Sequence, residues 1–169
     1  MYVHQTIQRP FGVNVFGSCV VRVKPDFATL AFAVTRTAEK PVDAFAAARK
    51  ATDEIRGFLA RSDVAGNDVQ SARATLRQAM RGYGDKLEYI GYQAKASFVV
   101  HLRDLDRLEH VLGGVVDAGA DVIDAVELRT SRLVELRVQA RERSILAAKK
   151  KAEGYAAAAG IVLGEVIHI

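Results

Sequence analysis

The stretch "IGYQAKASFVVHL", residues 90–102, alternates between two kinds of side chain along its whole length. One side is apolar and consists of Ile90, Tyr92, Ala94, Ala96, Phe98, Val100 and Leu102. The other side is mostly polar and includes Gln93, Lys95, Ser97 and His101. An unbroken period of two is typical of a strand in a sheet that is covered on one face only. This strand predicts the sheet around which the rest of the chain is organised.

Five further segments predict strands by alternation and by their turn residues. They are "VNVFGSCVVRV" (13–23), "FATLAFAVTRT" (27–37), the region 69–80 with Ala72, Ala74 and Leu76 on one face, "VIDAVELRT" (122–130) and the terminal residues 162–169. Lys24, Pro25 and Asp26 form a plausible turn, because proline presets its own φ and aspartate favours turns. We therefore expect the first two strands to form a hairpin.

Three segments show the three-and-four spacing of amphipathic helices. The first begins near Pro41, a residue favoured in the first helical turn, and presents Phe45, Ala48, Thr52, Ile55 and Leu59. The second begins at the N-cap Asp104, presents Leu105, Leu108, Leu112 and Val115, and stops near Gly119. The third begins at the N-cap Ser131, presents Val134, Val138, Ile145, Ala148, Ala152, Tyr155 and Ala159, and stops at Gly160.

The order of these elements is ββαββαβαβ, without regular βαβ alternation. This order predicts the α+β class, with a mainly antiparallel sheet and three helices packed on it. A chain of 169 residues can bury a substantial core as one domain, so we expect a single domain over residues 1–169. Residues 1–10 are expected to be a flexible or edge segment.

The third helix raises the question of nucleic-acid or membrane binding, because it carries Lys149, Lys150 and Lys151 in succession. Successive helical residues are rotated by about 100°, so the three lysines spread over roughly 200° and do not form a compact phosphate clamp. Glutamates at 135, 142 and 153 dilute the positive field further. The favoured interpretation is a docked helix with a basic, solvated back.

Residues with catalytic or metal-binding chemistry are scattered. The four histidines, His4, His101, His110 and His168, are not at metal-ligand spacings. Cys19 is the only cysteine, which excludes an internal disulfide and a multi-cysteine zinc site. It falls on an apolar strand face, where an unreactive thiol is expected. Asp104 and Asp106 flank a helix start, where carboxylates favour the dipole.

No nucleotide-binding motif is complete. "GYGDKLEYIG", residues 82–91, begins as G-x-G but lacks the glycine that completes G-x-G-x-x-G. "RGYGDK" (81–86) is expected to be a hairpin loop, with Tyr83 as a contact residue in the alternative interpretation. We therefore predict no catalytic, cofactor-binding or metal-binding residues, no cofactor, and a protein that is not an enzyme.

A basic surface is the remaining functional pattern. Arg73 and Arg77 share one predicted strand face, and Arg137 and Arg141 share a helical face. The net charge of +4 permits anionic partners without requiring them. Nucleic-acid modules add exposed aromatic side chains for stacking, and here only Tyr83 is suited to that role. Binding to nucleic acid or an anionic surface is thus the alternative function, and nucleic acid is an unlikely partner.

Several of these segments, in this order, resemble the SIMPL-domain family, which is catalogued as a domain of unknown function. The resemblance is carried by "VNVFGSCVVRVKPDFATLAFAV", "IGYQAKASFVVHLRDLDRLEHVL", "DAGADVIDAVEL" and "ARERSILAAKKKAEGYAAAAGIVLGEV". It extends from about Phe11 to Ile169. It implies an α+β fold and no established catalytic residues. It also implies similarity to bacterial periplasmic immunogenic and envelope-associated proteins, some linked to stress tolerance, and to family members that form oligomers.

We therefore expect a non-enzymatic protein that acts by self-assembly and protein binding or scaffolding. The expected homo-oligomer, a dimer or a ring, forms through sheet edges, with the apolar terminal segment "IVLGEVIHI" as one contact. No run approaches the roughly 18 apolar residues of a spanning helix. "MYVHQTIQRPFG" lacks the pattern of a signal peptide, which favours the cytoplasm if Met1 is native. A periplasmic protein with its signal peptide removed is the alternative.

Overall fold

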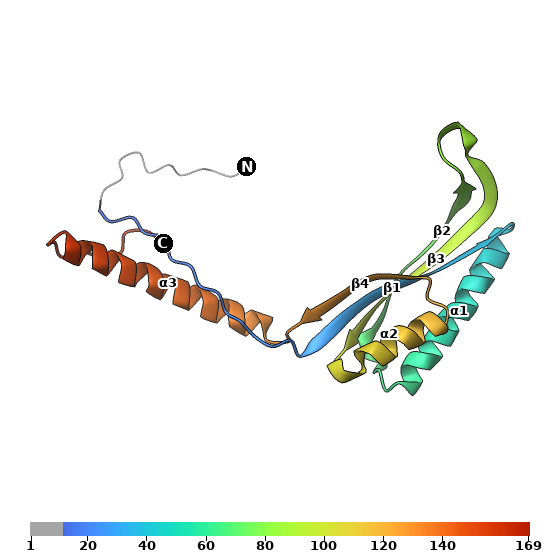
Figure 1. Cartoon of the computed structure of the whole chain (residues 1–169), viewed down its shortest axis with the longest axis horizontal. Coiled ribbons are helices and arrows are strands. Elements are labelled where there is room, and N and C mark those ends of the chain that lie inside the picture. Colours follow the sequence, from blue (N-terminus) through green and yellow to red (C-terminus); the bar gives the residue numbers. More distant parts are fainter. Residues whose placement is uncertain (1–11) are drawn as a thin grey trace. The chain divides into compact units, whose positions relative to one another are not determined.

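A computed structural model describes residues 12–169, apart from the side chains at positions 71, 72 and 85. Its main elements, labelled in Figure 1, are β1 (Phe27–Ala38), α1 (Pro41–Arg61), β2 (Val69–Arg81), β3 (Glu88–Leu102), α2 (Leu108–Asp117), β4 (Val122–Arg129) and α3 (Leu133–Ala158). Helices and an antiparallel sheet are both present, so the predicted α+β class is confirmed. The predicted order is retained from β1 to α3.

The described residues group into two compact units. The larger unit contains residues 24–131, and the smaller contains residues 12–23 together with residues 132–169. The single domain over residues 1–169 stays a prediction.

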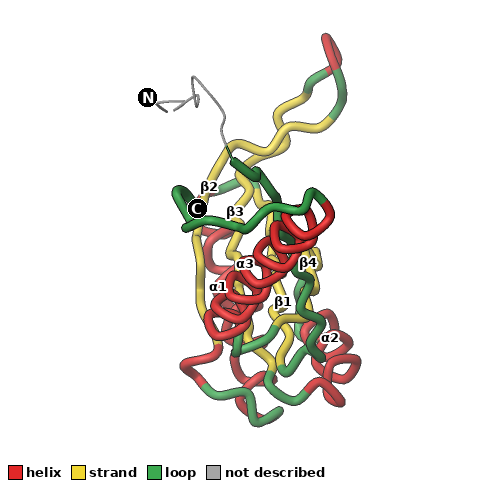
Figure 2. Tube along the Cα trace, turned by 90° about the vertical axis from the view of Figure 1, so that its left-hand side faces the viewer, coloured by secondary structure: helices red, strands yellow, loops and turns green. Residues whose placement is uncertain are grey.

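The larger unit is built on a four-stranded sheet in the order β2-β3-β1-β4, with every neighbouring pair antiparallel. β3 occupies an inner position between β2 and β1. The predicted alternation of residues 90–102 is confirmed, because Ala94, Phe98, Val100 and Leu102 are buried on one face. The β2–β3 hairpin extends past the other strands at one end of the sheet (Figures 1 and 2).

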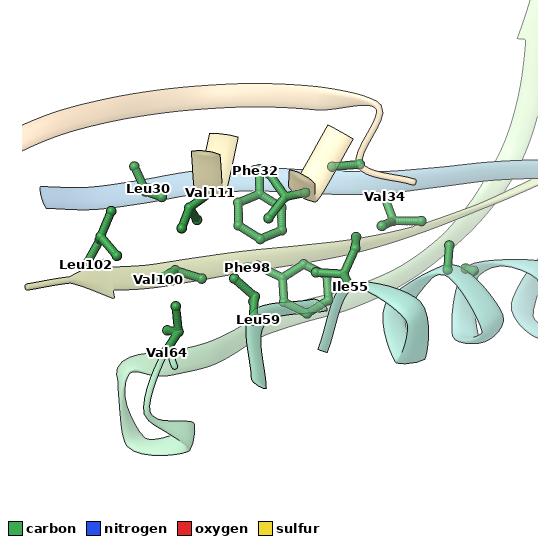
Figure 3. Close-up of a cluster of buried hydrophobic side chains, with 14 of the residues drawn as sticks. Leu30, Phe32, Val34, Ile55, Leu59, Val64, Phe98, Val100, Leu102 and Val111 are labelled. Carbon is green, nitrogen blue, oxygen red and sulfur yellow. The ribbon is translucent and has the colours of Figure 1, made fainter. Parts of the chain in front are cut away.

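The core lies between one face of this sheet and the helices α1 and α2 (Figure 3). At its centre Phe32 of β1 lies directly opposite Phe98 of β3, with stacked rings whose centroids are 5.2 Å apart. Each such side chain contributes about 1.5–3 kcal/mol by leaving water. α1 adds Ala44, Ala48, Ala51, Ile55 and Leu59, and α2 adds Val111 and Val115. Phe45, predicted for the buried face of α1, is 46% exposed.

The predicted hairpin of residues 13–23 with residues 27–37 is wrong. β1 pairs with β3 over residues 28–38 and with β4 over residues 27–33, so both of its sides are already occupied next to the predicted turn. Asp26 instead joins the two ends of the larger unit. Its carboxylate accepts hydrogen bonds from the Ser131 backbone N–H (2.8 Å) and from the Ser131 hydroxyl (2.7 Å).

This arrangement also corrects the predicted N-cap of the third helix. α3 begins at Leu133, with Arg132 at the N-cap position and no side-chain cap there, because the Ser131 hydroxyl is donated to Asp26. The same two hydrogen bonds lower the pKa of Asp26 from its ordinary value, the hydroxyl contributing most.

In the smaller unit, residues 12–23 run extended alongside α3 (Figure 1). Lys151 Nζ donates to the Phe16 carbonyl oxygen at 2.7 Å. Apart from Gln139, the side chains of α3 that are at least partly buried follow a spacing of four, namely Leu136, Ala140, Ser144, Ala148, Ala152 and Ala156. Small side chains allow an extended chain to approach a helix closely.

The predicted stripe of α3 is therefore confirmed only in part, at Ala148 and Ala152. Val134, Val138, Ile145 and Tyr155, which were expected to be covered, are 45–76% exposed. The predicted stop is confirmed, since Gly160 has φ +68° just after the helix ends. Residues 162–169 are exposed and form no strand, contrary to the sixth strand predicted there.

Candidate functional site at the sheet edges

The described histidines lie on different elements. His101 lies on the face of the sheet opposite α1 and α2, here called the open face, with its ring centroid 5.8 Å from that of Phe27. His110 lies on α2, with its ring centroid 5.7 Å from that of Phe58. His168 is exposed in the terminal segment, and His4 lies outside the described residues. Among residues 12–169, no group of three or more His, Cys, Asp or Glu side chains is arranged to hold a metal ion.

The other candidate side chains take structural positions. Cys19 is a partly buried thiol in the extended segment beside α3. Asp104 caps the short 3-10 turn Leu105–Arg107 that leads into α2, since its Oδ1 accepts from the Asp106 N–H at 3.1 Å. The capping role predicted for Asp104 is thereby confirmed, while Asp106 lies exposed in the first turn.

The predicted hairpin loop at residues 81–86 is confirmed between β2 and β3. Gly82 and Gly84 both have positive φ, which explains two glycines so close together. Tyr83 between them is 94% exposed. Met80, Leu87 and Tyr89 nearby are 49–56% exposed, so the end of the hairpin presents apolar surface.

The arginines of β2 share one face, as predicted. Arg73 lies opposite Ser97 and Arg77 lies opposite Gln93, both on the open face of the sheet. Arg77 Nε donates to Gln93 Oε1 at 2.9 Å. Arg137 and Arg141 are exposed on α3.

The exposed hairpin end and the arginines Arg73 and Arg77 both belong to the β2 edge of the sheet. Within the described part of the chain, β2 pairs on one side only, with β3. Its 13 residues include Arg73, Arg77 and Arg81 and no acidic residue. On the face that α1 and α2 cover elsewhere, Leu76 remains 37% exposed. This edge is long, basic and partly apolar.

The opposite edge is β4, which among the described strands pairs only with β1. Ile123, Val126 and Leu128 lie opposite residues of β1 whose side chains are buried, yet they are 36–57% exposed themselves. On the open face, Glu127 accepts hydrogen bonds from Arg129. β4 is shorter than β2, more apolar, and carries the acidic residues Asp124 and Glu127 together with one arginine, Arg129.

The start of the β2 edge is held by an ion pair between a buried carboxylate and an exposed guanidinium. Asp68, which is 8% exposed, accepts from Arg103 Nε at 3.0 Å and from Arg103 Nη2 at 2.9 Å. The hydrogen bond from Arg103 holds the pKa of Asp68 below its ordinary value of 3.8. Because Asp68 directly precedes β2 and Arg103 directly follows β3, the pair fixes the register where the two strands meet.

Sheet edges were predicted as contacts, but the strands that form them were not identified. The terminal segment was expected to be one contact, and it lies outside the sheet. One signal was present in the sequence, because "VQSARATLRQAMR" contains three arginines and no acid, whereas "VIDAVELR" contains two acids and one arginine. Within the described residues, no helix is long and apolar enough to cross a membrane.

The described residues define an α+β protein with a four-stranded antiparallel sheet, in which β2 and β4 each pair with one other described strand. The SIMPL family model, described as a protein of unknown function (DUF541), matches residues 13–169. The chain belongs to the SIMPL family, as its sequence blocks suggested.

Two relatives cover nearly the whole chain. An uncharacterized protein YggE of Edwardsiella ictaluri is 30% identical over 168 residues, covering 98% of this chain and 70% of the relative. The 26 kDa periplasmic immunogenic protein of Brucella melitensis is 25% identical over 172 residues, covering 98% of this chain and 68% of the relative. YggE of Escherichia coli K12 is 29% identical over 143 residues, covering 83% of this chain and 58% of the relative. The predicted cytoplasmic location gains no support from these relatives.

Proposed function

We propose that this SIMPL-family protein is not an enzyme and acts by assembling with copies of itself and by binding other proteins as a scaffold. The observation that carries the proposal is the pair of open sheet edges, each with half-exposed apolar side chains. Unpaired backbone N–H and C=O groups beside apolar side chains favour the addition of another strand. His101 and His110 each contact a phenylalanine ring, which supports a structural role for both.

We place this function in the periplasm or at the cell envelope. The proposal rests on the periplasmic relative from Brucella, which covers almost the whole chain. A link to stress tolerance stays an expectation from the family resemblance.

Light scattering coupled to size exclusion tests self-assembly. We expect a mass of at least two chains. This mass should decrease when the protein is diluted to concentrations below the dissociation constant. A mass of one chain (18.4 kDa) across micromolar concentrations would refute the proposal. The alternative function, binding of nucleic acid or an anionic surface, predicts instead a complex with DNA whose affinity falls steeply with salt.

A further inference from the structure

We infer that copies of this chain join head to tail, with the β2 edge of one copy paired to the β4 edge of the next. The inference rests on the proposed self-assembly and specifies the two surfaces that meet. Three observations carry it: the direction of the edge strands, the charge of each edge, and the apolar side chains that both edges leave half exposed.

Strand direction permits this pairing without turning the neighbour over. Because the sheet has four strands and each neighbouring pair is antiparallel, β2 and β4 run in opposite directions. A second copy placed beside the first in the same orientation therefore brings its β2 antiparallel to the first copy's β4. The helices α1 and α2 of both copies then cover the same face of one continuous eight-stranded sheet.

Charge distinguishes this arrangement from a symmetric one. A two-fold axis beside β2 also gives antiparallel pairing, but it places Arg73 and Arg77 against the same arginines of the partner. Like charges directly opposite one another destabilise strand pairing. In the head-to-tail arrangement these arginines instead approach β4, which carries Asp124 and Glu127 as well as Arg129. Glu127, whose carboxylate accepts from Arg129, lies on the same face of the sheet as Arg73 and Arg77.

The other face of the junction is apolar on both sides. Leu76 of β2 lies on the face that the helices cover, as do Val126 and Leu128 of β4. Their exposed fractions are 37%, 41% and 57%. Pairing of the edges would bring these side chains together and remove them from water. The two faces of each edge thus favour the same partner, one through charge and the other through apolar contact.

Charge reversal tests the inference in the full-length chain. Both Arg73→Glu/Arg77→Glu and Glu127→Lys are expected to weaken assembly, raising the apparent dissociation constant more than about tenfold. An equimolar mixture of the two variants should assemble again, because each reversed edge then meets a complementary one. Recovery in the mixture also shows that both variants are folded. Arg137→Glu/Arg141→Glu on α3 makes the same change in net charge and should leave the mass unchanged.

Each outcome separates this inference from the proposed function. A wild-type chain that stays monomeric overturns self-assembly altogether. If the wild type assembles and either edge variant retains its affinity, or the folded variants fail to recover when mixed, the assignment of β2 to β4 is wrong while self-assembly stands. Equal loss of assembly in the α3 control would also overturn the edge assignment, because the effect would then follow net charge.

Discussion

Gly17 lies so close to the carbonyl oxygen of Ser144 that a Cβ atom at position 17 has no room there. The same Cβ would lie 2.6 Å from the Ala148 backbone nitrogen and 2.8 Å from the Ala148 Cβ. Gly17→Ala should therefore force residues 12–23 away from α3. The expected loss is about 1–3 kcal/mol of unfolding free energy for the smaller unit, the range for overpacked sites. Chemical denaturation and local hydrogen exchange of α3 measure it.

Gly154→Ala is the matched control, because a Cβ there has no atom within 4 Å. Replacing a glycine inside a helix by alanine should stabilise α3 by about 0.5–1 kcal/mol. If both alanine variants changed stability by the same amount, the close packing of residues 12–23 on α3 would be refuted.

α2 offers a second matched pair of glycines. A Cβ at Gly114 would collide with the ring of Phe58 on α1, whereas a Cβ at Gly113 meets nothing within 4 Å. We expect Gly114→Ala to lower the free energy of unfolding by about 1–3 kcal/mol and Gly113→Ala to raise it by about 0.5–1 kcal/mol. Thermal and urea denaturation would reveal the difference. Equal effects would mean that α1 and α2 are not packed as described.

The Asp68–Arg103 pair predicts a specific dependence of stability on pH. The pKa of Asp68 is lower in the folded chain than the ordinary 3.8, so folding favours the ionised carboxylate. The stabilisation is therefore fully present at pH values above 3.8 and is lost as the pH falls through the folded pKa. Asp68→Asn should be less stable than the wild type at pH 7, and the two should converge as the pH falls from 3.8 through the lower folded pKa. A difference independent of pH would contradict the role of the ion pair.

Cys19 and His101 are expected to be dispensable for assembly. Neither lies on the β2 or β4 edge, and neither belongs to a group of ligating or catalytic side chains among the described residues. Cys19→Ser should leave the assembled mass unchanged. His101→Ala should cost about 0.5–1.5 kcal/mol of stability through loss of its contact with Phe27, again without loss of assembly. Loss of a defined activity in either folded variant would point to a chemical function.

The sequence predicted the elements of the larger unit well, because their signals are local. The alternation of residues 90–102 identified the buried face of β3, and the turn glycines at 82 and 84 identified the β2–β3 loop. Periodicity alone does not specify strand order, however. Residues 13–23 alternate as a strand does, yet they lie beside a helix because β1 is already paired on both sides.

The third helix shows a related limit. The predicted stripe combined large apolar residues such as Val134 and Ile145 with Ala148 and Ala152. Only its small members are covered, together with Ala140 and Ala156, which the prediction did not include. The close approach of residues 12–23 requires small side chains on this face of α3. This contact joins segments more than one hundred residues apart in the sequence, so local periodicity does not reveal it. The candidate site escaped prediction for the same reason, since an edge exists only once the strand order is known.

The central claim is that the edges of this sheet are the surfaces through which the protein assembles. Amide hydrogen exchange followed by mass spectrometry tests it most directly, at a concentration where the chain is assembled and at one where it is dissociated. We predict slower exchange in both β2 and β4 in the assembled protein, with β1 and β3 unchanged because both already pair on two sides. Equal exchange of β2 and β4 in the two states, with assembly established by mass, would contradict the account.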